Sequence, residues 1–218
     1  MWAPWNIGPW WATLAAVVFA LAVAAALARA VGVLLRGFPA RHRRRRLFLL
    51  VPAPVFAAAS VWAFGPTPAA LSAIVLILTL LALALIDGES GLLPDLLTQP
   101  LLWLGLLVNL NGAFVSLHDA VLGAVAGYLV LWSVYRLFLL CTGREGMGHG
   151  DFKLLAALGA WLGWATLPWV LLASSSLALA AALGLRLTGR MAAGEPLMFG
   201  PYLAAAGILV LFGVFAMA

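Results

Sequence analysis

One stretch decides the fold: Gly146-Met-Gly-His-Gly-Asp-Phe-Lys-Leu-Leu-Ala-Ala-Leu-Gly-Ala-Trp-Leu-Gly163, where a glycine-rich loop changes into a long apolar run. Alternate glycines in the loop lack Cβ atoms, so the backbone there can come close to another segment. Gly159 and Gly163 form a small-xxx-small pair, which lets membrane helices pack closely. Asp151 lies where the loop meets the apolar run, and an ionisable group so near to hydrocarbon is a candidate functional residue.

The composition of the whole chain is that of a membrane protein. Of its 218 residues, 66% are hydrophobic and 9% are charged, and the mean hydropathy is +1.12. Soluble domains have about 25% charged residues. A membrane span needs about 20 apolar residues, so the chain has room for about eight helices and short loops. We therefore expect an all-α, polytopic membrane protein in which residues 1–218 form a single transmembrane domain.

Apolar runs place the expected helices between breaks that carry glycine, proline and asparagine. The runs are Trp10–Leu35, Leu47–Phe64, Ala69–Ile86, Leu96–Leu110, Ala120–Leu140, Phe152–Leu167, Pro168–Leu185 and Phe199–Met217. The fourth and sixth runs have about 15 residues each, which is short for a full crossing. The residues before Trp10 lack the basic segment and cleavage site of a secretory signal, so we expect the first helix to be retained.

The basic residues predict the orientation. Most arginines fall in loops that an eight-span chain places on one side of the membrane, namely Arg36, Arg41, Arg43, Arg44, Arg45, Arg46, Arg144, Arg186 and Arg190. The positive-inside rule assigns that side to the cytoplasm and both termini to the periplasm. The run Arg41–Arg46 is typical of an orientation signal that touches anionic lipid. The net charge of +5 therefore does not indicate a nucleic-acid partner.

Two aspartates stand at helix ends on this same side. Asp87 ends the third run and Asp151 begins the sixth, so both lie at the same membrane depth and can meet. Two carboxylates in a partly dry site divide one proton, and such a pair can activate water while it protonates an amide. On spacing alone, two interfacial acids that cap helix ends remain an alternative. The other acids on this side are Glu89, Asp95, Glu145 and Glu195.

Three motifs resemble those of the type IV prepilin peptidases, polytopic aspartic proteases of the bacterial inner membrane. Gly148-His-Gly-Asp-Phe-Lys-Leu-Leu-Ala156 is similar to the GxGD signature of that family. Leu85-Ile-Asp-Gly-Glu-Ser-Gly-Leu-Leu-Pro-Asp95 is similar to its upstream Asp and Leu-Pro-Asp triplet, and Phe199-Gly-Pro-Tyr202 is similar to its Phe-Gly-Pro segment. The motifs come in the family's order.

The resemblance implies an intramembrane aspartic endopeptidase with Asp87 and Asp151 as catalytic residues. Its expected substrate is a prepilin or pseudopilin of a type IV pilus or type II secretion system, with a basic leader and a hydrophobic helix, cut at the cytoplasmic face of the inner membrane. The residues expected to bind substrate or to shape the site are Gly148, Gly150, Asp95, Glu89, Glu145, Phe199, Gly200 and Pro201. No metal or organic cofactor is implied. We expect His149 to be solvated and Lys153 to be a surface anchor.

The chain departs from the family pattern after its first helix. Many members have an insert there with two Cys-x-x-Cys pairs, linked to N-methylation of the new amino terminus. This chain has the arginine-rich stretch Arg36–Arg46 instead, and its one cysteine is Cys141. Methyltransferase activity is therefore in doubt.

Two other functions stay open at this point. A small proton- or cation-coupled transporter would use Asp87 and Asp151 as ion sites, although these acids lie at one face and the two halves show no repeat. A GxGD protease with a non-pilin substrate is a nearer alternative. If the chain is a protease, the helix dipoles place the negative charge on Asp151, at a helix N-terminus, and the proton on Asp87, at a helix C-terminus.

Overall fold

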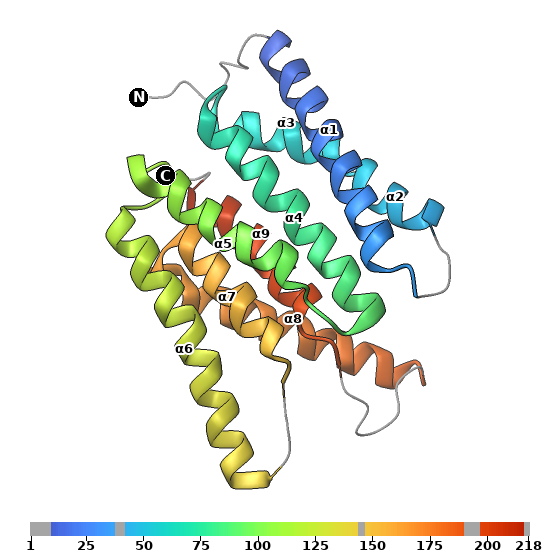
Figure 1. Ribbon diagram of the computed structural model, residues 1–218, viewed down its shortest axis with the longest axis vertical. Coiled ribbons are helices and arrows are strands. Elements are labelled where there is room, and N and C mark those ends of the chain that lie inside the picture. The colour runs from blue at the N-terminus through green and yellow to red at the C-terminus, as the bar shows by residue number, and fades with distance from the viewer. Residues whose placement is uncertain (1–9, 38–41, 144–146, 190–196, 216–218) are drawn as a thin grey trace. The chain divides into compact units, whose positions relative to one another are not determined.

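The computed structural model describes residues 10–37, 42–143, 147–189 and 197–215, and these contain helices and no strand. Figure 1 shows the helices in chain order. Their bounds are α1 Trp10–Leu34, α2 His42–Leu50, α3 Ala53–Phe64, α4 Pro68–Ser90, α5 Asp95–Val108, η1 Asn109–Asn111, α6 Leu117–Thr142, α7 His149–Leu162, η2 Trp164–Thr166, α8 Leu167–Leu187 and α9 Gly200–Phe215.

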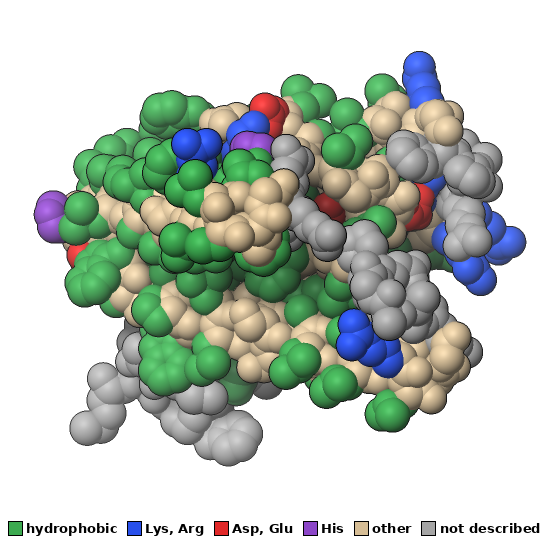
Figure 2. Space-filling view, turned by 90° about the horizontal axis from the view of Figure 1, so that it is seen from below, with side chains coloured by type: hydrophobic (Ala, Val, Ile, Leu, Met, Phe, Trp, Pro, Cys, Tyr) green, Lys and Arg blue, Asp and Glu red, His purple; other side chains and the backbone are tan. Residues whose placement is uncertain are grey.

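Five of these segments are long and apolar enough to cross a membrane: Trp10–Leu34, Arg43–Phe64, Pro68–Ser90, Leu117–Thr142 and Trp164–Leu187. Helices α5 and α7 have 14 residues each, as short as the fourth and sixth runs predict. Hydrophobic side chains also cover much of the surface visible in Figure 2. The prediction of an all-α, polytopic membrane protein is therefore confirmed, and the eight crossings stay a prediction.

Several boundaries differ from the predicted runs. The second run, Leu47–Phe64, is divided into α2 and α3, and the sixth, predicted to end at Leu167, ends as α7 at Leu162. The second helical segment begins at His42 instead of Leu47, so most of the arginine run lies on helix α2. Helix α4 continues to Ser90 instead of ending at Ile86. The reason is Gly91, which has a φ of 67° and donates its N–H to the Asp87 carbonyl at 2.7 Å. A glycine in this left-handed conformation is a common helix C-terminus.

The chain forms two compact units, one of Met1–Ala82 with Leu211–Ala218 and one of Leu83–Val210. In the first unit, helix α1 packs against α3. Their buried faces consist largely of small residues at helical spacing: Ala12, Ala16, Ala20, Ala24 and Ala28 on α1, and Ala53, Ala57 and Ser60 on α3. Helix α2 is tied to the end of α1 by Arg45, whose buried guanidinium donates to the Leu35 carbonyl at 3.3 Å. Small residues let the helix backbones come close.

Helix α7 is the core of the second unit. Phe152 and every residue from Leu154 to Leu162 are buried, because α5 and α6 pack along the helix (Figure 1). A side chain on Gly123 of α6 would collide with the backbone of Gly159. The small-xxx-small glycine therefore serves close helix packing, as the sequence predicts.

Buried polar side chains fix the far end of α7. The Asn109 amide donates to the carbonyls of Ala160 and Trp161 at 2.9 and 3.1 Å, and its oxygen accepts the N–H groups of Phe114 and Val115. The indole N–H of Trp161 donates to the Leu101 carbonyl at 2.8 Å. These bonds fix the C-terminal end of α7, whereas Asp151 lies in the first turn at its N-terminal end.

Candidate active site

Two carboxylates of the second unit are buried at helix ends. Asp87 lies in the last turns of α4 with 6% of its surface exposed, and Asp151 lies in the first turn of α7 with 7% exposed. A buried carboxylate is costly unless it is hydrogen-bonded or protonated. The surroundings of each group therefore decide which form it takes.

The first residue of helix α9, Gly200, contacts Asp87. The backbone N–H of Gly200 donates to Asp87 Oδ2 at 3.0 Å. A Cβ atom on Gly200 would lie 2.6 Å from that oxygen and 2.9 Å from Cγ, so the contact requires glycine. Pro201 Cγ lies 3.9 Å from where a Cβ of Gly88 would be. The Phe-Gly-Pro segment thus packs on the helix turn that carries Asp87.

Asp151 lies outside the five candidate spans. Burial, and then the carboxylate of Asp87, raise the pKa of Asp151 to about 7. The contribution of Asp87 shows that the two groups lie within electrostatic range. A Cβ on Gly148 would lie 3.9 Å from Asp151 Oδ2. Like charges close together disfavour ionisation of both members of a carboxylate pair, and the shift at Asp151 has this direction.

These contacts favour the reverse of the proton assignment that helix dipoles predict. A hydrogen bond to a charged group is worth about 1.5–3 kcal/mol, whereas a helix-dipole effect is worth about 0.3–1 kcal/mol at exposed sites. The Gly200 N–H therefore opposes the effect of the C-terminal position of Asp87 on α4 and favours its anion. The raised pKa of Asp151 favours the protonated form of that residue.

The Leu-Pro-Asp segment contacts the glycine loop. A Cβ on Gly150 would lie 2.6 Å from Leu93 Cβ, so Leu93 packs on the bare backbone of the loop. Lys153 Nζ lies 2.6 Å from Asp95 Oδ1, in an ion pair between α7 and the first residue of α5. The expectation that Lys153 is a surface anchor stays a prediction, and the structure adds that its charge is directed at Asp95.

The other expected site residues differ in how far their side chains are exposed. Glu89 is half-buried on α4, and Phe199 is half-buried just before α9. Glu145 and Glu195 lie outside the described residues. His149 is exposed, and its ring packs on Tyr135 at 5.1 Å between centroids.

The structure adds residues that sequence reasoning missed. Leu93 contacts Gly150, and Lys153 pairs with Asp95. Each contact joins segments far apart in the chain, and nothing in the neighbouring sequence indicates the partner. In the described part of the chain, no three His, Cys, Asp or Glu side chains gather as metal ligands would.

Comparison with known proteins places the chain in a family. Residues 74–185, about half of the chain, match the type IV leader peptidase family. Among curated relatives, the prepilin leader peptidase/N-methyltransferase of Aeromonas hydrophila is 60% identical over 141 residues, which are 65% of this chain and 49% of the relative. The protein of that name from Pseudomonas aeruginosa is 55% identical over 151 residues, 69% of this chain and 52% of the relative.

This chain spans about half the length of the curated relatives it matches. No solved structure matches it. The family match extends from α4 into α8 and includes Asp87, Asp95 and Asp151. The chain therefore belongs to the type IV leader peptidase family.

Proposed function

We propose that this protein is an intramembrane aspartic endopeptidase that removes the basic leader from type IV prepilin-like or pseudopilin precursors. The observation that carries the proposal is the pair of buried carboxylates, Asp87 and Asp151, within electrostatic range at the ends of two helices. The family match and the name of the curated relatives support a prepilin as the substrate.

The dyad divides the chemistry between its members. Asp87, whose anion is favoured by the hydrogen bond from the Gly200 N–H, takes a proton from water while the water oxygen adds to the scissile carbonyl carbon. Asp151 gives its proton to the carbonyl oxygen, which completes a neutral gem-diol. When the C–N bond breaks, the proton on Asp87 moves to the leaving nitrogen, and Asp151 recovers a proton from a gem-diol hydroxyl. Both carboxyl groups return to their starting states.

The surroundings of the dyad suit a substrate with a basic leader and a hydrophobic helix. Glu89 lies two residues after Asp87 and adds negative charge near the site, whereas Asp95 is already paired with Lys153. Gly148 has no side chain beside Asp151, which favours close approach of a substrate backbone, whereas Gly150 shapes the site by accepting Leu93 against its backbone. We propose that Phe199, Gly200 and Pro201 shape the other side of the site.

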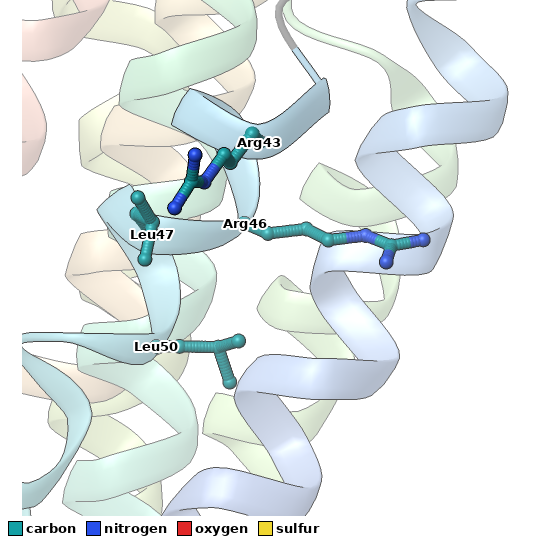
Figure 3. Close-up of a pocket in the computed structure, with 4 residues that line it drawn as sticks. All are labelled: Arg43, Arg46, Leu47 and Leu50. Carbon is teal, nitrogen blue, oxygen red and sulfur yellow. The ribbon is translucent and has the colours of Figure 1, made fainter.

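The arginines support a location in the bacterial inner membrane, with the dyad at the cytoplasmic face and both termini in the periplasm. In this arrangement the chain acts as one transmembrane protease domain. We also propose that anionic lipid binds along Arg41–Arg46. Arg43, Arg46, Leu47 and Leu50 of α2 line a surface cavity of about 730 Å³ (Figure 3). Two guanidinium groups beside two leucines suit a lipid with an anionic headgroup.

The alternatives fit less well. A proton- or cation-coupled transporter does not explain the family match over residues 74–185. A GxGD protease with a non-pilin substrate would keep the same dyad, so the substrate must be tested directly.

The test is incubation of the purified protein with a prepilin, followed by sequencing of the amino terminus of the product. We expect one cut between the basic leader and the hydrophobic helix. Asp87→Asn and Asp151→Asn should each abolish the cut while they keep the fold, because an amide cannot exchange the required proton. Near wild-type cleavage by either variant would show that the dyad is not the catalytic centre.

A further inference from the structure

Two segments meet beside the dyad and are joined at two points. One segment is Leu92–Asp95, which connects α4 to α5, and the other is Gly148–Lys153, which opens α7. Leu93 packs on Gly150, and Asp95 pairs with Lys153 at 2.6 Å. The two contacts lie one residue before and two residues after Asp151. The first turn of α7 is thus held on both sides of the carboxylate that it carries.

We infer that the Asp95–Lys153 ion pair, together with the Leu93–Gly150 contact, positions the Asp151 carboxyl for catalysis. Asp95 and Lys153 are positioning residues, because they act through the turn that carries Asp151. The inference rests on the proposed function in that it takes Asp151 as a member of the catalytic pair. It gives Asp95 a role other than attraction of the basic leader.

The ion pair is better suited to positioning than to stability. The side chain of Lys153 is 29% exposed and that of Asp95 is 61% exposed, and ion pairs this open to water contribute little to folding. Catalysis is much more sensitive, because a displacement of about 1 Å at a reacting group can slow a reaction by about a hundredfold. Loss of the pair should therefore reduce kcat with little change in Tm.

A direct role for Asp95 in binding the leader makes different predictions. If Asp95 attracted the basic leader, Asp95→Asn would raise KM. Removal of the Lys153 charge would then free the Asp95 carboxylate for the leader and would lower KM or leave it unchanged. If the pair positions Asp151, either substitution breaks the same contact. Both variants should then lose kcat to the same extent, and the double variant should be no worse.

The experiment measures kcat and KM of the full chain in detergent with a prepilin substrate. Asp95→Asn, Lys153→Met and the double variant should each lower kcat about ten- to hundredfold, with KM within about twofold of wild type. Lys153→Arg should keep most of the activity, and the exchange Asp95→Lys with Lys153→Asp should recover part of it. Wild-type kcat in Lys153→Met, or an Asp95→Asn effect on KM alone, would overturn the inference.

Arg136→Met is the matched control. Arg136 is an exposed cation on α6, 5.8 Å from the Trp132 ring. Its substitution removes the same charge and adds the same side chain as Lys153→Met, on a helix that carries neither of the two joined segments. We expect its kcat, KM and Tm to be unchanged.

A second measurement separates the positioning role from the proposed function. A hydrophobic carbodiimide modifies protonated carboxyl groups, and mass spectrometry can follow the reaction at Asp151 without any substrate. Asp95→Asn and Lys153→Met should change the rate of Asp151 modification by the same factor, and Arg136→Met should not change it. If the wild-type protein cuts no prepilin but these rates change together, the proposed substrate is wrong and the positioning role stands. Unchanged rates in both variants refute the positioning role.

Discussion

Substitution of Gly200 by alanine tests the contact between helix α9 and the dyad. The new Cβ would lie 2.6 Å from Asp87 Oδ2, 2.9 Å from its Cγ and 3.2 Å from its Cβ. A relaxed carbon–oxygen contact is about 3.3 Å or longer, so the carboxylate or the start of α9 must move by about 0.7 Å. The movement also weakens the 3.0 Å hydrogen bond from the Gly200 N–H.

Two independent arguments give the size of the effect. A displacement of about 1 Å at a reacting group lowers the rate by about a hundredfold, so about 0.7 Å predicts somewhat less. Loss of a hydrogen bond to a charged group costs about 1.5–3 kcal/mol, and each 1.36 kcal/mol of barrier is about a tenfold change in rate. We therefore expect Gly200→Ala to lower kcat about ten- to hundredfold.

The assay is cleavage of a prepilin by the purified variant, with Tm measured on the same sample. Gly213→Ala is the control, because it makes the same substitution on α9 where a Cβ meets nothing within 4 Å. We expect it to match wild type in kcat. If Gly200→Ala also keeps kcat within about twofold, the start of α9 does not hold a catalytic carboxylate, and the proposed division of roles between Asp87 and Asp151 is refuted.

Three further predictions follow from the charges and the composition. Burial and the Asp87 carboxylate raise the pKa of Asp151 from 3.8 to about 7, so cleavage should fall as the pH rises through about 7. As the pH rises from 3.8 to about 7, the free energy of unfolding of the wild-type protein should fall relative to that of Asp151→Asn. A difference between the two proteins that does not change with pH would exclude the raised pKa. Single cysteines at positions 43, 148 and 190 in a Cys141→Ala background should react from the cytoplasm alone, and labelling of any of them from the periplasm would refute the eight-span topology. The cut pilin should keep an unmodified amino terminus when S-adenosylmethionine is present, and a gain of one methyl group by mass spectrometry would refute this.

The sequence predicts the helices well because lipid imposes a simple rule on them. A span must be long, apolar and helical, so runs of apolar residues give the elements and their order. The predicted ends of the third and sixth runs are wrong because a glycine, and not the end of the apolar run, ends each helix, namely Gly91 after α4 and Gly163 after α7. Helix α4 therefore continues past Ile86 to Ser90, and Asp87 lies inside the helix.

The contacts around the dyad are a different kind of problem. Gly200 with Asp87, Leu93 with Gly150, and Lys153 with Asp95 each join segments that are distant in the chain. Periodicity and turn chemistry describe only neighbours along the sequence, so they carry no information about these partners. The motifs indicate which residues matter, and the fold shows which of them touch.

The proton assignment shows why this difference matters for chemistry. If helix α4 is considered alone, Asp87 is a carboxylate near its C-terminus, where a negative charge is disfavoured. In the folded protein it receives the backbone N–H of Gly200 from the start of another helix. A direct hydrogen bond from the N-terminus of another helix contributes more free energy than the dipole of the residue's own helix. The charge state of a buried carboxylate therefore also depends on a helix that begins beside it in space, and at Asp87 it is a glycine that permits this close approach.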